Sequence, residues 1–199
     1  MPLIPIHSVR EAVAHLKAGD LVIYPTETAY ALGVDPCQPR AIKKIFFVKG
    51  RQHTKALPLV AASATMVAKF CIIPLEAMPL LHRYWPGPLT LVLQPRRKSF
   101  LSAVRGGRPT LAIRVSSEPL ARAISHKLGR PVVATSANRS GEQNCYSLKA
   151  LKQSLGRTPW PIYVVAKGTL PRRRPSTIVA FVRGSMQVIR SGTIHPPLI

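Results

Sequence analysis

Short apolar runs of strand length alternate with helical segments along this chain, and this alternation restricts the fold more than any other feature. Ser8 and Glu11 form a capping box that opens a helix, and Gly19 is placed to end it. Residues 21–24 then read as a buried strand that Pro25 cuts short. Repetition of this pattern predicts an α/β fold, and the strands that cluster late in the chain indicate a mixed sheet.

The same reading assigns the rest of the chain. Further helices are predicted over residues 39–49, 63–70, 75–84, 118–128 and 147–155, with Ser117 as the cap of the fourth. Further strands are predicted over residues 57–61, 89–93, 110–115, 131–135, 162–165, 177–181 and 187–190. Residues 94–109 are expected to form a basic loop that contains glycine.

Length and composition favour one soluble domain. With 199 residues and 46% hydrophobic content, the chain is long enough for one core, so we predict a single domain over residues 1–199 with its core at about 5–192. No apolar run approaches the length that spans a bilayer, and the N-terminus lacks the features of a secretory signal. We therefore expect a cytoplasmic protein with no membrane partner.

Cysteine and histidine are not arranged for a metal site. Cys37, Cys71 and Cys145 are widely spaced and form no Cys-x-x-Cys pair, and the six histidines show no ligand spacing. We expect neither a disulfide framework nor a metal held by protein ligands.

The charge balance is strongly positive. The chain has 29 Lys plus Arg against 7 Asp plus Glu, which gives +22 and a pI near 11.3. A field of this sign attracts polyanions such as nucleotides and RNA. The densest segments are residues 96–98, Arg105 with Arg108, and residues 172–174. A general composition bias would produce the same numbers, so the charge indicates an anionic partner without naming it.

Several short polar motifs indicate a nucleotide site. Lys49-Gly50-Arg51 closes a helical stretch, and the segment Thr135 to Gly141 follows a strand-like run. Two cations at a tight glycine turn can grip phosphates, and small hydroxyl and amide side chains past a strand end can approach a ligand closely. Neither a Walker A loop nor a Gly-x-Gly-x-x-Gly motif is present, so such a site would be built from side chains.

Further motifs complete a recognisable order. They are Tyr24 to Gly33, Trp85 to Thr90, Leu111 to Val115, Pro175 to Ile178 and Arg190 to Gly192. Taken together with the two polar motifs, they resemble the YrdC (TsaC) family, the threonylcarbamoyl-AMP synthases, from about Val22 to Gly192. The resemblance implies a YrdC-like domain in which helices flank a twisted mixed sheet with a basic concave cleft.

The resemblance also implies a reaction. L-threonine, bicarbonate and ATP give threonylcarbamoyl-adenylate and pyrophosphate, with Mg²⁺ accompanying ATP. Downstream tRNA threonylcarbamoyl-transfer proteins then use the product, and contact with tRNA or double-stranded RNA is expected.

The matching positions imply roles for individual residues. Lys49 and Arg51 are the implied catalytic cations. The residues implied to bind ATP are Lys49, Arg51, Thr110, Ser136, Asn138, Asn144 and Arg190. The residues implied to bind threonine are Thr26, Arg114, Thr135 and Ser176.

Side-chain chemistry alone leaves alternatives open for several of these residues. A cation such as Arg114 in a buried strand needs a counter-charge, which is either a ligand carboxylate or one of the few acids of the chain. Glu27 is the carboxylate near the predicted site, and an ion pair of its own loop is equally compatible with its position. Ser136 and Asn138 either contact a ligand or form an Asx or Ser/Thr turn.

The chain departs from the family pattern in two places. Ala31 stands where the family usually has Gly, and residues 52–57 differ from the usual sequence after Arg51. Lys55 is a candidate replacement for the contacts that this loop normally makes.

Two other functions compete with the synthase. One is a non-catalytic RNA-binding protein of the same fold, and the other is a carbamoyl-transfer enzyme that works on carbamoyl-adenylate.

Overall fold

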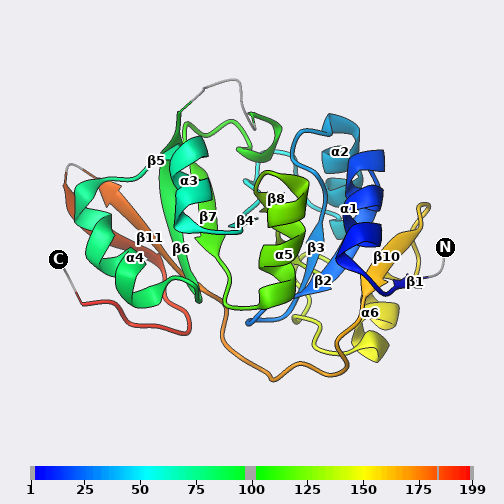
Figure 1. The fold of residues 1–199 in the computed structure, drawn as a ribbon. Coiled ribbons are helices and arrows are strands. Elements are labelled where there is room, and N and C mark those ends of the chain that lie inside the picture. The colour runs from blue at the N-terminus through cyan, green and yellow to red at the C-terminus, as the bar shows by residue number, and fades with distance from the viewer. Residues whose placement is uncertain (1–2, 97–101, 183, 198–199) are drawn as a thin grey trace.

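A computed structural model describes residues 3–96, 102–182 and 184–197, whose strands form two mixed sheets with helices packed against them (Figure 1). The predicted α/β class with mixed strand order is therefore confirmed, and the strands are divided between two sheets. Arg97 and Lys98 of the first basic cluster lie outside the described residues.

The first sheet has the strand order β1-β10-β2-β3-β9. Its strands are β1 (Leu3–Ile6), β2 (Leu21–Pro25), β3 (Tyr30–Gly33), β9 (Thr135–Ser136) and β10 (Ile162–Val165). The contacts of β10 with β1 and β2 are parallel, whereas β3 runs antiparallel to both β2 and β9. Both β1 and β3 are absent from the sequence prediction.

The second sheet has the order β12-β11-β6-β7-β4-β8, and β5 pairs with β6 at its side. Its strands are β4 (Leu59–Ala61), β5 (Cys71–Ile72), β6 (Leu89–Pro95), β7 (Leu111–Val115), β8 (Val132–Val133), β11 (Thr177–Val182) and β12 (Ser185–Arg190). Parallel pairs (β11 with β6, β4 with β7) alternate with antiparallel pairs, so this sheet is also mixed.

The predicted strand over residues 131–135 is wrong as a single element. Val132 and Val133 pair with β4 in the second sheet, whereas Thr135 and Ser136 pair with β3 in the first. The chain changes sheets at Ala134, whose N–H donates to the Pro58 carbonyl at 2.8 Å. As a result, the Ser-x-Asn segment begins where the two sheets meet.

Six α-helices are present in the described ranges. They are α1 (Val9–Ala18), α2 (Pro39–Lys49), α3 (Ala64–Phe70), α4 (Met78–Tyr84), α5 (Pro119–Leu128) and α6 (Leu148–Leu155). The apolar faces of α1 and α5 pack into one core cluster that includes Leu16, Val22, Ile124 and Val132. A larger core cluster extends from Leu21 and Tyr30 of the first sheet to Leu91 and Ile113 of the second.

Local sequence rules explain most helix ends. The predicted cap of α1 is confirmed, because Ser8 Oγ accepts from Glu11 N–H. The Glu11 carboxylate reaches back to accept from Ser8 Oγ and from His7 N–H, one residue before the cap. Gly19 ends α1 with φ 81°, a left-handed conformation that glycine adopts without strain.

Two predicted helix starts are wrong. The cap of α5 is Glu118 and not Ser117, because Pro119 sits in the first turn and the Glu118 carboxylate accepts from Leu120 N–H. Residues 75–77 form a separate 3₁₀ turn before α4, since Pro79 lacks the N–H that would extend the α-helix backward.

A long segment joins the two sheets. Residues 166–176 leave β10 of the first sheet and reach β11 of the second, and they run along the lower edge of the molecule in Figure 1, in orange. Leu170 N–H donates to the Tyr146 carbonyl at 2.8 Å, and Tyr146 Oη donates to the Arg173 carbonyl at 3.1 Å. These contacts hold the segment against residue 146 and deliver Pro175 and Ser176 to the space between the sheets.

Candidate functional site

A cavity of about 430 Å³ lies between the two sheets. Its wall includes residues of β3 and β9 from the first sheet, residues of β6, β7, β11 and β12 from the second, and the loops around residues 26–29 and 51–58. A volume of this size is in the range of small-molecule sites. The residues predicted to bind ligands that line it are Thr26, Arg51, Arg114, Thr135, Ser136, Asn144, Ser176 and Arg190.

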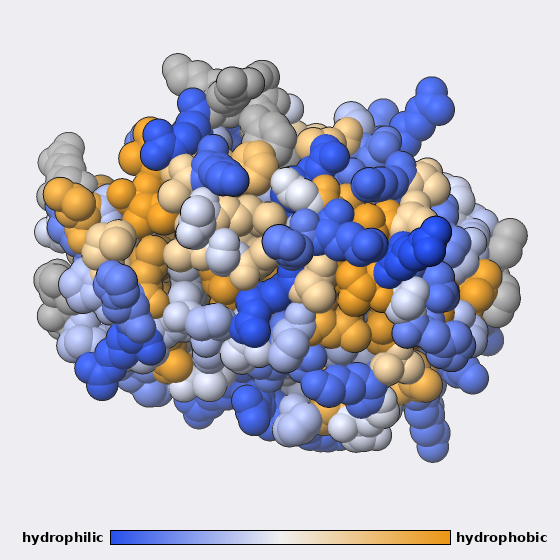
Figure 2. Space-filling model, in the orientation of Figure 1, coloured by the Kyte–Doolittle hydropathy of each residue, from blue (hydrophilic) through white to orange (hydrophobic). Residues whose placement is uncertain are grey.

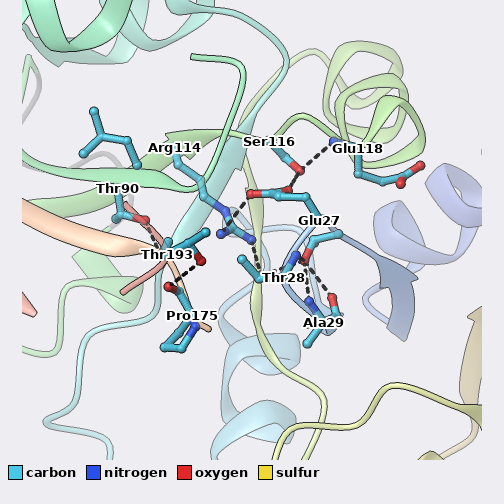
Figure 3. Close-up of polar contacts among 12 residues, drawn as sticks. Glu27, Thr28, Ala29, Thr90, Arg114, Ser116, Glu118, Pro175 and Thr193 are labelled. Atoms are coloured by element: carbon cyan, nitrogen blue, oxygen red, sulfur yellow. Dashed lines mark hydrogen bonds and ion pairs between the residues drawn. The ribbon is translucent and has the colours of Figure 1, made fainter. Parts of the chain in front are cut away.

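Arg114 is a buried cation in this wall. It points from β7, and its side chain is only 9% exposed. Its Nη1 lies 3.2 Å from Oε1 of Glu27, and its Nη2 donates to Thr28 Oγ1 at 3.2 Å (Figure 3). The sequence left a ligand carboxylate and an internal acid as possible counter-charges, and the structure shows the internal acid in place.

The hydroxyl of Thr26 is engaged in a turn at the end of β2. Its Oγ1 donates to the Ala29 carbonyl at 2.7 Å and accepts from the backbone N–H groups of Thr28 and Ala29. Oγ1 of Thr26 is also 3.0 Å from Oγ1 of Thr28. Thr26 therefore lines the cavity as part of a Ser/Thr turn.

Ser176 and Arg190 meet at another part of the wall. Arg190 donates to the Ser176 carbonyl from Nε at 3.2 Å and from Nη2 at 2.7 Å, and Oγ of Ser176 lies 2.8 Å from Thr90 Oγ1. Burial lowers the pKa of Arg190, and the nearby charge of Arg114 lowers it further. Two guanidinium groups that repel each other across one cavity favour an anion between them.

Gly192 explains how this part of the wall is held together. A side chain at residue 192 would collide with the backbone of Pro175 and Ser176. Its N–H donates to Thr177 Oγ1 at 3.1 Å, while Thr193 Oγ1 donates to the Pro175 carbonyl (Figure 3). Gly192 at the end of the Arg190 to Gly192 motif therefore allows its segment to pack closely against the backbone of Pro175 and Ser176.

The loop after α2 and the segment before β7 supply further cations. Arg51 is half-buried, and burial lowers its pKa; Lys55 and Arg108 are exposed and line the same cavity. Arg51 Nη2 contacts the Ala56 carbonyl at 3.4 Å. The predicted substitute Lys55 thus lies where a phosphate or carboxylate contact is expected, and Arg108, which sequence reasoning treated only as surface charge, lies there too.

Lys49 is placed differently from Arg51. Its Nζ donates to the carbonyls of Ser136 and Asn138 at 2.5 and 2.7 Å, and its own carbonyl accepts from Ser140 N–H. Burial lowers the pKa of Lys49 to about 8, with the charge of Arg51 as a second cause. Lys49 does not line the cavity; it fixes the loop that carries Ser136, which does.

The remaining predicted residues divide in the same way. Thr135 and Ser136 of β9, together with Asn144, line the cavity, whereas Thr110 and Asn138 do not. Asn138 Nδ2 donates to the Glu142 carbonyl at 2.6 Å and closes its loop, and its buried Oδ1 has no hydrogen-bond partner among the described residues. The predicted nucleotide contacts of Lys49, Thr110 and Asn138 stay predictions.

Neither a metal cluster nor a membrane helix occurs in the part of the chain that the structure describes. No group of three or more His, Cys, Asp or Glu residues is placed to hold an ion there. None of the helices in those ranges is both long and apolar enough to cross a membrane. Hydrophilic side chains are spread over much of the face seen in Figure 2, with apolar side chains gathered in separate areas between them.

Fold and cavity together define an α/β protein whose cation-lined, ligand-sized cavity lies between two mixed sheets. The family model described as Telomere recombination, which covers Sua5, YciO and YrdC, matches residues 14–192. The chain therefore belongs to the Sua5/YciO/YrdC family.

Individual relatives agree with this. A threonylcarbamoyl-AMP synthase of Halorhodospira halophila is 37% identical over 149 residues, which are 74% of this chain and 78% of that protein. A Chromobacterium violaceum protein of the same name is 32% identical over 187 residues, which are 92% of this chain and 94% of that protein.

Solved structures show the same fold. The crystal structure of P. abyssi Sua5 complexed with L-threonine superposes with a TM-score of 0.85 at 30% identity, covering 96% of this chain and 58% of that one. This chain thus spans a little over half the length of the P. abyssi protein. E. coli YciO superposes with a TM-score of 0.81 at 21% identity over 96% of this chain and 94% of that chain, which is a likeness of fold.

Proposed function

We propose that this chain is a threonylcarbamoyl-AMP synthase, which forms threonylcarbamoyl-adenylate and pyrophosphate from L-threonine, bicarbonate and ATP. The observation that carries the proposal is one cavity in which two kinds of site residue meet. Arg114, Thr135 and Ser176 suit a small hydroxylated amino acid, and the cations Arg51 and Arg190 suit a triphosphate. Relatives that bear this name cover most of the chain.

The chemistry requires positioning more than acid-base catalysis. The amine of threonine adds to the carbon of bicarbonate with loss of water, and an oxygen of the resulting carbamate attacks the α-phosphorus of ATP while pyrophosphate leaves. Cations in a partly enclosed cavity lower the energy of this step because negative charge grows on the leaving group. Arg51 and Lys55 would meet the phosphates, and Arg114 would hold the threonine carboxylate.

Magnesium fits this site as a companion of ATP. The described residues offer no carboxylate cage, and Mg²⁺ prefers phosphate oxygens and water with few protein ligands. When bound to ATP, the ion neutralises part of the phosphate charge; the chain's own contribution is to hold the phosphates with Arg51, Lys55 and Arg190.

Contact with RNA is the second candidate function. The side chains of Arg172, Arg173 and Arg174 are exposed on the segment that joins the two sheets, and Arg172 lies 5.9 Å from the ring centroid of Tyr146. Cations near an aromatic ring suit a nucleic acid. The proposed partners are tRNA and the proteins that carry the threonylcarbamoyl group onward to it.

Calorimetry tests the assignment of substrates. Threonine should bind saturably, and more tightly when a nucleotide is present, because both ligands occupy one cavity. Serine, which lacks the methyl group, serves as the matched control ligand and should bind more weakly. Absence of threonine binding under every nucleotide condition would favour the RNA-binding alternative.

A further inference from the structure

We propose that Glu27 and Thr28 are positioning residues, which hold the guanidinium of Arg114 so that its remaining N–H groups serve a carboxylate in the cavity. The inference rests on the proposed function, in which Arg114 binds the carboxylate of threonine. Neither residue was among those expected to bind a substrate. Both lie in the turn between β2 and β3, and both contact terminal nitrogens of Arg114 (Figure 3).

These contacts use part of the hydrogen-bonding capacity of the Arg114 guanidinium. An arginine side chain has five N–H groups in one plane and accepts no hydrogen bond. Glu27 Oε1 lies 3.2 Å from Nη1 as an ion pair without hydrogen-bond geometry, and Thr28 accepts a hydrogen bond from Nη2 at 3.2 Å. The remaining N–H groups are available to a ligand of the cavity that Arg114 lines.

The hydrogen bonds of the Thr26 and Thr28 hydroxyls identify which of the two is the donor. Thr26 Oγ1 gives its single proton to the Ala29 carbonyl, so in its 3.0 Å contact with Thr28 Oγ1 the proton must come from Thr28. Thr28 in turn accepts from Arg114. Neither hydroxyl keeps a proton for a substrate carboxylate, and Thr26 acts by fixing Thr28.

The Glu27 carboxylate is also fixed through its other oxygen. Its second carboxylate oxygen accepts from Ser116 Oγ, which also accepts from Glu118 N–H at 3.2 Å. The Glu27 side chain is 5% exposed and does not line the cavity. Glu27 therefore neutralises Arg114 and fixes its orientation without touching a ligand.

Two charge-neutral variants test the inference. Thr28→Val removes the acceptor of Nη2, and Ser116→Ala frees the Glu27 carboxylate, while the net charge stays the same. Each should raise the KM for threonine about threefold to tenfold, the loss expected when one side chain must be ordered on binding. The KM for ATP and kcat should change less than about twofold, and Thr28→Ser should restore the wild-type KM.

Glu27→Gln tests the charge separately. The amide loosens the guanidinium and also unmasks its charge, whereas Ser116→Ala only loosens it. Inhibition by acetate, competitive with threonine, should therefore be several-fold stronger in Glu27→Gln than in Ser116→Ala. Glu118→Gln is the matched control, because that carboxylate pairs with Lys167 at 2.9 Å and not with Arg114. It should leave both constants and acetate inhibition unchanged.

Steady-state pyrophosphate release, with melting curves for each variant, decides the outcome. Folded Thr28→Val and Ser116→Ala proteins with unchanged threonine KM, or with equal rises for threonine and ATP, would overturn the inference. Acetate inhibition in Glu27→Gln that is no stronger than in Ser116→Ala would overturn it too. Failure of the wild-type protein to respond to threonine would instead overturn the proposed function.

Discussion

The buried ion pair between Arg114 and Glu27 gives a quantitative prediction for stability. Arg114→Met leaves the carboxylate of Glu27 buried without its cation. Loss of one partner of a buried pair costs about 3–5 kcal/mol, and we expect about 3 kcal/mol because Ser116 still donates to Glu27. In the double variant Arg114→Met, Glu27→Gln no unpaired charge is left, so the loss should fall to about 1–2 kcal/mol, the scale of a few lost hydrogen bonds.

Denaturant unfolding of the wild type, both single variants and the double variant measures this difference. Glu27→Gln alone should cost about 2 kcal/mol, because it leaves Arg114 without its counter-charge but Arg114 lines the cavity. The double-mutant cycle should therefore give a coupling energy of about 3–4 kcal/mol with unchanged m-values. Glu118→Gln combined with Arg114→Met is the matched control and should be additive. Additive losses in the Glu27 cycle, within about 0.5 kcal/mol, would show that the pair is not coupled in the folded protein.

Three further predictions concern cationic residues. Burial lowers the pKa of Lys49 to about 8, so its ammonium loses its charge as the pH rises through 8. If this charge attracts the phosphates, as the predicted nucleotide contact requires, the KM for ATP should rise between pH 7 and pH 9. Lys49→Met should lack this dependence, and a flat wild-type profile would contradict it. Arg51→Ala should lower kcat about ten- to a hundredfold in steady-state assays, and a change in threonine KM alone would speak against a phosphate contact. Replacing Arg172, Arg173 and Arg174 by Gln should reduce the slope of log affinity for tRNA against log salt by about 2–3, and an unchanged slope would place the RNA elsewhere.

Local sequence rules predicted the regular elements well. The capping box of Ser8 and Glu11 and the glycine after α1 act within one turn of helix, so sequence spacing is enough to identify them. The change of sheet at Ala134 could not be predicted in this way. Val132 to Ser136 reads as one β-rich run, and its division depends on partners more than 70 residues away in sequence, β4 and β3.

Prediction of the site residues met the same limit. The motifs located Arg51, Arg114, Ser176 and Arg190, which the fold brings into one wall. The direction of the Lys49 ammonium depends on the carbonyls of Ser136 and Asn138, which are 87 and 89 residues away in sequence. A local sequence pattern cannot predict such distant partners.

The Glu27 to Arg114 pair is a similar case. The sequence offered Glu27 as a neighbour of the site and left its partner open, because only tertiary packing brings the β2–β3 turn against β7.

Pyrophosphate release from ATP is the most direct test of the central claim, that this cavity activates threonine through its carbamate. The protein is incubated with Mg²⁺ and ATP, and threonine and bicarbonate are added separately and together. We expect release that requires both additions and that is slower when serine replaces threonine. Pyrophosphate release that is independent of threonine, or tRNA binding without any release under these conditions, would contradict the synthase assignment.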